Sequence, residues 1–311
     1  MIKKKSIVYI AYNRPELTKL TFQIIKKYKP REIFLILDGP KKNDLLDQIN
    51  CNKVKNIVTD IKWKCKIYKN FSKDNTGLKK RIITGLDWVF SKTDKAIILE
   101  DDCLVGLDFF NFCNLMLDKY KNNSDAFMIS GTNFLENEIK DEFFFSNYGI
   151  FWGWATWRKS WKLYRSSKNF WIRNRNRINW KRISNSKKII QHWIGVFNKV
   201  YLKNYNTWDY QFWASMWFYK KYAIVPKLNL VRNLGFGQNS THTKNINDNK
   251  IMKKLNKFKK PSYFGKLLRY QKYDDKLAKK FFLEITLLNF FKKKIYNIYS
   301  NFFIYNNKRG Y

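Results

Sequence analysis

Three consecutive carboxylates, Glu100, Asp101 and Asp102, are the strongest chemical signal in the sequence. They directly follow the apolar run Ala96–Leu99 in the stretch "KAIILEDDCLVGLDFF". Neighbouring carboxylates repel one another and burial adds a desolvation cost, so such a cluster needs a compensating cation. Carboxylate oxygens suit Mg²⁺ or Mn²⁺, which often take one or two protein ligands and complete their shell with diphosphate oxygens and water. The alternative is that these acids only cap the helix that follows.

Two further polar groups follow apolar runs nearer the N-terminus. Arg14 comes after "SIVYIAYN", and its forked donors are suited to phosphate. Asp38 comes after "EIFLIL" and can accept hydrogen bonds from a nucleotide base or ribose. The alternatives are a solvated arginine beside a proline turn and an ordinary turn-forming aspartate.

The elements that must position these residues are short apolar strands that alternate with amphipathic helices. We expect strands within residues 7–11, 32–40, 64–70, 95–102 and 125–133, and helices over 16–28, 77–92 and 108–120. Continuous apolar strands that alternate with helices are typical of an α/β fold with a mostly parallel central sheet and helices on both faces. Ligands bind such sheets outside the carboxyl ends of the strands, where Arg14, Asp38 and the acid triplet are all expected.

The middle of the chain is rich in tryptophan and poor in acids. "FWGWATWRKSW" contains Trp154, and "TWDYQFW" contains one acid, Asp209. Tryptophan faces pack against sugar rings, although the alternative for each of them is ordinary core packing. Gly153 would let the backbone approach a ligand. A Gly/Asn/Ser-rich loop with one arginine, Arg232, follows in "LVRNLGFGQNSTHT".

These motifs together resemble a known family of enzymes. In order and spacing, "IAYNRPE", "LILDGP", "IILEDDCLVGLDFF", "FWGWATWRKSW", "WDYQFW" and "NLGFGQNSTHT" resemble GT-A fold glycosyltransferases of the N-acetylglucosaminyltransferase I type and related bacterial nucleotide-diphospho-sugar transferases. The resemblance covers roughly residues 5–245. It implies a Rossmann-like GT-A fold and an inverting transfer of a sugar from a nucleotide-diphosphate donor, usually with Mn²⁺.

The resemblance also implies roles for individual residues. Asp102 corresponds to the metal ligand, and Asp209 to the catalytic base. The implied donor-binding residues are Arg14, Asp38, Glu100, Asp101, Trp154 and Arg232, the last within a loop (232–243) that orders over the donor. Inverting transfer needs one base to deprotonate the acceptor hydroxyl, which Asp209 would supply.

The charge of the chain is large and uneven. The 311 residues carry a formal net charge of +38; residues 1–150 contribute +7 and residues 151–311 contribute +31. This asymmetry suggests a polyanionic partner, although a general lysine-rich composition explains part of it. We expect a catalytic domain over 1–250 and a basic helical C-terminal region over 251–311, which would attach to an anionic membrane that presents a glycan or lipid-linked acceptor.

The cellular setting and the rival functions follow from what the sequence lacks. Four scattered cysteines, no signal-peptide pattern and no long apolar run lead us to expect a cytoplasmic protein, peripheral on the inner face of the membrane, in surface polysaccharide assembly. One rival is a basic nucleic-acid-binding protein, although no binding motif for a specific nucleic acid appears. The other is a metal-dependent nucleotidyltransferase, although the N-terminal strand lacks a Gly-rich phosphate loop.

Overall fold

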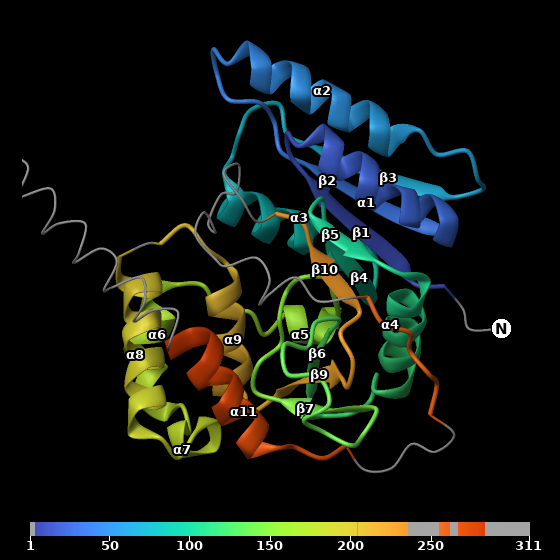
Figure 1. Ribbon diagram of the computed structural model, residues 1–311. Coiled ribbons are helices and arrows are strands. Elements are labelled where there is room, and N and C mark those ends of the chain that lie inside the picture. The colour runs from blue at the N-terminus through green and yellow to red at the C-terminus, as the bar shows by residue number, and fades with distance from the viewer. Residues whose placement is uncertain (1–3, 204, 236–254, 262–266, 284–311) are drawn as a thin grey trace, which may run out of the picture.

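An eight-stranded sheet forms the centre of the protein in the computed structural model, which describes residues 4–203, 205–235, 255–261 and 267–283 (Figure 1). The strands lie in the order β3-β2-β1-β4-β8-β6-β9-β7. Their bounds are β1 Ser6–Ala11, β2 Glu32–Leu37, β3 Lys66–Phe71, β4 Lys95–Glu100, β6 Ala126–Ser130, β7 Phe143–Ser146, β8 Trp154–Trp157 and β9 Tyr222–Pro226.

Most strands of this sheet run in the same direction. β3, β2, β1 and β4 pair in parallel, and β6 and β9 share their direction, whereas β7 and β8 run the opposite way. The buried aliphatic run of β1 explains its central place, because Ile7 pairs with Ile33 on one side and Ile97 on the other. The predicted mostly parallel sheet is therefore confirmed.

Helices cover both faces of the sheet, as the sequence predicts. Alternate residues of β1 contribute to different cores, with Tyr9 in one core and Val8 in the other. α1 Pro15–Tyr28, α2 Leu45–Thr59 and α4 Leu107–Lys119 pack on the Tyr9 face. The Val8 face carries α3 Leu78–Lys92, α5 Arg158–Trp161, α6 Lys168–Asn174, α7 Trp180–Ile183, α8 Lys187–Leu202 and α9 Asp209–Phe218, with the short turn η1 Arg175–Arg177 after α6.

A separate two-stranded ribbon lies over the end of β4. β5 (Cys103–Val105) pairs antiparallel with β10 (Val231–Asn233), so Leu104 lies opposite Arg232. The ribbon is extended by a hydrogen bond from the Leu234 amide to the Asp102 carbonyl at 2.8 Å. It therefore places the segment around Arg232 directly against the acid triplet.

The described part of the C-terminal region belongs to the core. α11 (Gln271–Leu277) and the π-helical turn η2 (Ala278–Leu283) pack Tyr273 and Leu277 into the cluster on the Val8 face. Asp274 is fully buried and accepts hydrogen bonds from Ser146 at 2.5 Å and from the Asn147 amide at 3.1 Å. The division expected near residue 250 stays a prediction, but residues 273–283 pack within the same core as the sheet.

Two features bear on the cellular setting of the chain, namely the hydrophobicity of its helices and the state of its cysteines. Across the described residues, no helix is both long enough and apolar enough to cross a bilayer. All four cysteines are free thiols: Cys103 and Cys113 are buried, and Cys51 and Cys65 are partly buried.

Candidate functional site

Arg14 lies at the junction between β1 and α1, at the carboxyl edge of the sheet. It occupies the N-cap position of α1, ahead of Pro15, and its side chain makes no capping hydrogen bond. Arginine is not a residue that N-caps favour, since it offers no acceptor for the free amides of the first turn. The guanidinium instead reaches across to the acid triplet after β4.

The acid triplet is bound to Arg14. Asp101 is 2% exposed and forms an ion pair with Nη2 of Arg14, while Oδ2 of Asp102 lies 3.1 Å from Nη1. Asp101 also accepts a hydrogen bond of 3.4 Å from the Tyr12 amide. The forked guanidinium therefore bridges two adjacent carboxylates, a geometry that arginine makes well.

The electrostatics of the triplet follow from burial and mutual repulsion. Burial, with repulsion from Asp102 and Asp101, raises the pKa of Glu100 to about 8, although Arg14 opposes the rise. Burial likewise raises the pKa of Asp101 to about 6, against the lowering effect of Arg14. The pKa of Arg14 itself is raised by Asp101 and Asp102, although burial alone would lower it. Burial and repulsion therefore drive Glu100 towards its neutral form at neutral pH.

Asp209 approaches the triplet from the opposite side of the fold. It begins α9, where acids are favoured, and accepts hydrogen bonds from Thr207 and from the Tyr210 amide. Repulsion from Asp209 contributes to the raised pKa of Glu100, which places the two carboxylates within electrostatic range. The structure thus joins Arg14 to Asp101 and Asp102 and brings Asp209 within electrostatic range of Glu100, whereas the predicted roles of these residues stay predictions.

Asp38 holds the backbone together at the end of β2. Its carboxylate accepts hydrogen bonds from the Thr76 amide and hydroxyl, both at 2.9 Å, and from the Gly77 amide at 3.1 Å. These bonds fix the loop that leads into α3. Asp38 is therefore a structural acceptor in this structure, and its recognition of a base stays a prediction.

Trp154 is a core residue in this structure. It is 1% exposed and stacks on Trp208 with ring centroids 5.5 Å apart, so its contact with a donor stays a prediction. Gly153 likewise serves packing: it has a φ of +59°, and a Cβ there would lie 2.8 Å from Val231. Its missing side chain admits β10, not a ligand.

The segment after β10 lies on Asp102. The Gly235 amide donates to Asn233 at 2.6 Å, and a Cβ at Gly235 would lie only 2.3 Å from Oδ2 of Asp102. Arg232 is exposed on β10 beside this contact. Most of the predicted donor-covering loop, residues 236–243, lies outside the described residues.

The side chains available as metal ligands decide whether a divalent cation fits the site. Within the described ranges, no three His, Cys, Asp or Glu side chains gather as a metal-binding group. Asp102 offers a carboxylate at the sheet edge, with 16% of its side chain exposed. One protein carboxylate fits a Mg²⁺ or Mn²⁺ ion that is shared with diphosphate oxygens, and does not fit an ion held by protein ligands alone.

Asp47 is a positioning residue that our sequence analysis missed. It is buried on α2 and accepts hydrogen bonds from Tyr12, Asn13 and the Lys41 amide. Burial alone would raise the pKa of Asp47, but these bonds lower it. Asp47 therefore anchors the two residues that precede Arg14. A signal was present: Asp44 accepts from the Asp47 amide, and the "DLLD" spacing is that of a helix cap.

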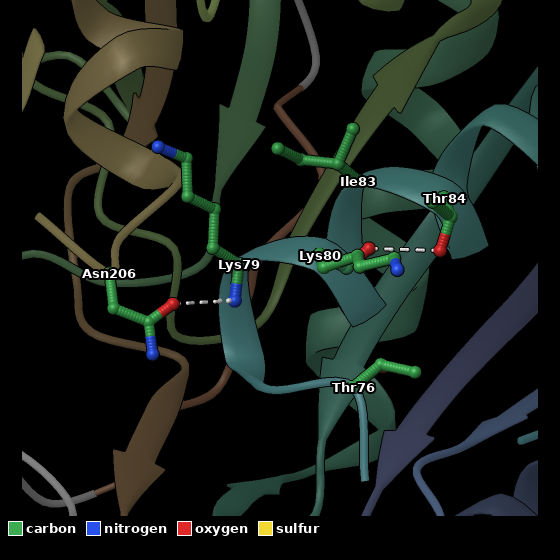
Figure 2. Close-up of a pocket in the computed structure, with 6 residues that line it drawn as sticks. All are labelled: Thr76, Lys79, Lys80, Ile83, Thr84 and Asn206. Atoms are coloured by element: carbon green, nitrogen blue, oxygen red, sulfur yellow. Dashed lines mark hydrogen bonds between the residues drawn. The ribbon is translucent and has the colours of Figure 1, made fainter. Parts of the chain in front are cut away.

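A basic hollow lies beside the site, at the start of α3. It measures about 440 Å³ and is lined by Thr76, Lys79, Lys80, Ile83, Thr84 and Asn206 (Figure 2). The Lys79 amide donates to Asn206 at 3.4 Å, which ties the loop before Asp209 to α3. Thr76 connects the hollow to Asp38. Two ammonium groups and two hydroxyls make it suited to an anionic, hydroxyl-bearing ligand.

Comparisons with known proteins give only distant likenesses. No protein-family model and no curated protein matches the sequence. Among solved structures, HddC from Yersinia pseudotuberculosis is 11% identical, with a TM-score of 0.31 over 50% of this chain and 77% of that one. The same protein complexed with GMP-PN is 12% identical, with a TM-score of 0.29 over the same shares. A UDP-glucose pyrophosphorylase complexed with UDP-glucose is 11% identical, with a TM-score of 0.31 over 53% of this chain and 81% of that one.

Likenesses of this size establish neither activity nor ligand. The described elements by themselves define the class: an α/β protein with a mostly parallel sheet, whose carboxyl edge carries an arginine-bridged acid pair.

Proposed function

We propose that the chain is an inverting glycosyltransferase of the GT-A type, which moves a sugar from a nucleotide-diphosphate donor to a hydroxyl acceptor. The observation that carries this proposal is the ion pair of Arg14 with Asp101 and Asp102 at the carboxyl edge of the sheet, with Asp209 near enough to repel Glu100. A ligand that bears both phosphates and sugar hydroxyls matches this mixture of guanidinium and carboxylates.

In this reaction Asp209 is the base. Its carboxylate accepts the proton of the acceptor hydroxyl as that oxygen bonds to the anomeric carbon and the bond to the diphosphate breaks. The start of α9 holds Asp209 through Thr207 and the Tyr210 amide. The start of α9 therefore positions the proposed base.

Arg14 and Asp102 act at the leaving group. Arg14 is a cation at the site that can donate hydrogen bonds to phosphate oxygens in place of the aspartates. Asp102 would hold Mn²⁺ or Mg²⁺ together with the donor diphosphate, and the ion would stabilise negative charge on the leaving group. In this proposal Glu100, Asp101 and the basic hollow at α3 would contact the sugar and nucleotide of the donor.

We further propose that the acceptor is lipid-linked and is met at an anionic cytoplasmic membrane surface. α2 exposes an apolar patch of Leu45, Leu46 and Ile49, which are 71%, 67% and 42% exposed. Lys41, Lys42 and Lys53 are close to it in sequence and are exposed. The patch begins α2, the helix that follows the end of β2. Exposed aliphatic residues among lysines fit an anionic bilayer.

A metal-dependent nucleotidyltransferase is the second candidate, because a carboxylate edge and a nucleotide-sized hollow also suit that reaction. The released product separates the two enzymes: a glycosyltransferase releases a nucleoside diphosphate, and a nucleotidyltransferase releases pyrophosphate. Salt-sensitive retention on nucleic acid, without either product, would favour the basic-protein alternative.

The test is a thermal-shift screen of nucleoside diphosphates with and without Mn²⁺. A ligand of the folded state raises Tm, and we expect a rise for one nucleotide that requires the metal and is lost in Asp102→Asn. The matched control is Asp94→Asn, since Asp94 is an exposed aspartate in a surface ion pair away from the site. If no nucleoside diphosphate raises Tm under any metal condition, the proposal is wrong.

A further inference from the structure

Arg14 occupies a helix N-cap position without capping the helix, and its side chain contacts residues far away in the sequence. An N-cap normally carries a small polar side chain that binds the first-turn amides, and Arg14 leaves that role unfilled. Its guanidinium instead bridges Asp101 and Asp102 beyond β4. Local rules broken in this way are expected where a residue serves function.

The sequence led us to expect that a metal ion compensates the negative charge of the acid triplet. In the structure, the ion pair with Arg14 compensates part of this charge. Asp101 is buried, so its charge needs a partner in the folded chain whether or not a ligand is bound. Arg14 is that partner, and it also donates to the oxygen of Asp102 that faces the backbone of Gly235. The acid pair is therefore already neutralised in part by a fixed cation.

A divalent cation and the guanidinium would compete for the same carboxylates. Two cations close together repel each other, and removing Arg14 from Asp101 would leave a buried charge without its partner. A diphosphate changes this balance, because its oxygens offer Arg14 new acceptors and offer a metal the ligands that the protein lacks.

We infer that Arg14 is a resident counter-ion of the acid pair, so that a divalent cation binds appreciably only together with a diphosphate. Its role is to position the two aspartates before any ligand arrives. The part of this inference that concerns diphosphate rests on the proposed function, whereas the part that concerns metal alone does not.

The experiment measures Tm against Mn²⁺ concentration, without nucleotide, for the full chain and its variants. We expect the wild type to shift by less than about 1 °C with Mn²⁺ alone. Arg14→Met should melt several degrees lower, on the order of 5 °C, and should regain much of this loss with Mn²⁺. Lys19→Met is the control, because Lys19 is an exposed cation on the same helix, and it should behave like the wild type.

A second variant keeps the test decisive if Arg14→Met does not fold. Arg14→Met/Asp101→Asn removes the cation and its buried partner together, so it should fold, should be more stable than Arg14→Met, and should respond weakly to Mn²⁺. The inference is overturned if Mn²⁺ alone stabilises the wild type as much as Arg14→Met. It is equally overturned if Arg14→Met has the wild-type Tm without metal.

A final arm adds inorganic pyrophosphate to the wild type with and without Mn²⁺. We expect a Tm rise with both that exceeds the sum of the rises with each alone. Additive rises would contradict the ordered binding. Failure of every nucleotide to bind would refute the proposed function, yet would leave the metal-only comparison of Arg14 variants valid.

Discussion

At the scale of single residues, the site is governed by how one arginine and five carboxylates share charge. Arg14 bridges Asp101 and Asp102, Glu100 is driven towards its neutral form, Asp209 approaches from α9, and Asp47 fixes the loop that carries Arg14. Asp209 and Asp47 are held by hydrogen bonds with neighbouring groups, whereas Arg14 and Asp101 depend on each other. Substitutions of Asp209 should therefore test its role without unfolding the chain.

Asp209→Asn tests the assignment of the base. An amide keeps the shape of the side chain but cannot take a proton, so we expect transfer to fall by about 10²–10⁴-fold. The Tm rise with nucleoside diphosphate and Mn²⁺ should persist, because donor binding does not need the base. Asp94→Asn serves as the control. Full activity of Asp209→Asn would exclude this residue as the base.

Gly235→Ala tests the close contact over Asp102. The added Cβ would meet Oδ2 of Asp102 at 2.3 Å, so either the carboxylate or the backbone after β10 must shift. We expect the affinity for nucleoside diphosphate with Mn²⁺ to fall at least about tenfold, with a small change in Tm. Gly195→Ala is the matched control, because a Cβ there meets nothing within 4 Å and alanine favours the helix. Unchanged affinity in Gly235→Ala would show that Asp102 is not part of the ligand site.

At the scale of elements, the sequence predicted the regular part of the fold well. Apolar runs such as Ala96–Leu99 favour a sheet covered on both faces, so β1–β4, β6 and their carboxyl edge followed from the apolar pattern, whereas β7, β8 and β9 were not predicted. The pairing of β5 with β10 did not follow, because three-residue strands from distant parts of the chain carry no periodicity.

The membership of the candidate site stays a prediction, but one contact within it is now visible. Arg14 and Asp102 were expected at strand ends and form an ion pair in the structure, whereas Asp209 was named from the resemblance. That Arg14 neutralises the acids was not visible, since a sequence does not give side-chain direction. The burial of Trp154 was equally hidden, because a tryptophan next to a glycine reads the same on a surface and in a core.

The docking of α11 on the sheet gives a prediction about pH. Burial raises the pKa of Asp274 to about 6 from 3.8, although Ser146, the Asn147 amide and Arg269 oppose the rise. Between pH of about 4 and about 6 the folded chain therefore keeps a proton that the unfolded chain has lost. Below pH of about 4, Asp274 therefore contributes about 3 kcal/mol to the free energy of unfolding. This contribution is lost as the pH rises to about 6.

Asp274→Asn removes this dependence, since an amide does not titrate. We expect the unfolding free energy of the wild type, relative to Asp274→Asn, to decrease from pH 4.5 to pH 7 in urea melts. Arg269 is the cation that pairs with Asp274. Asp275→Asn is a suitable control, because Asp275 is the next residue in the chain but accepts a hydrogen bond from Ser184. Parallel pH curves for wild type and Asp274→Asn would contradict the raised pKa.

At the scale of the whole molecule, the core extends beyond the expected boundary near residue 250. A chain that ends there would lose Tyr273, Asp274 and Leu277 from the main core. We expect truncation after residue 250 to lower Tm by more than roughly 10 °C or to prevent folding, since several large buried side chains are removed. Truncation after residue 283 should keep most of the Tm. Equal melting of the two truncated chains would show that α11 does not stabilise the fold.

The net charge of +38 and the α2 patch together predict how the molecule meets a membrane. Charge alone would attract any basic protein to anionic lipid, and salt would weaken that attraction evenly. Insertion of Leu45, Leu46 and Ile49 would add an apolar contribution that salt does not screen. The triple change Leu45→Ser/Leu46→Ser/Ile49→Ser should therefore weaken binding to phosphatidylglycerol-containing vesicles at least about tenfold, and more visibly at high salt.

The matched control changes exposed aliphatic residues on other elements, as Ile172→Ser/Leu202→Ser. Vesicle co-sedimentation at low and high salt, with purely zwitterionic vesicles as reference, measures each variant. Equal binding of the triple variant and the control would reject the α2 patch as the contact and leave charge as the sole attraction. A change in oligomeric state of the triple variant, seen by gel filtration without any change in vesicle binding, would assign the patch to a second copy of the chain. Only a loss of vesicle binding that survives high salt agrees with a site that opens towards lipid-linked acceptors.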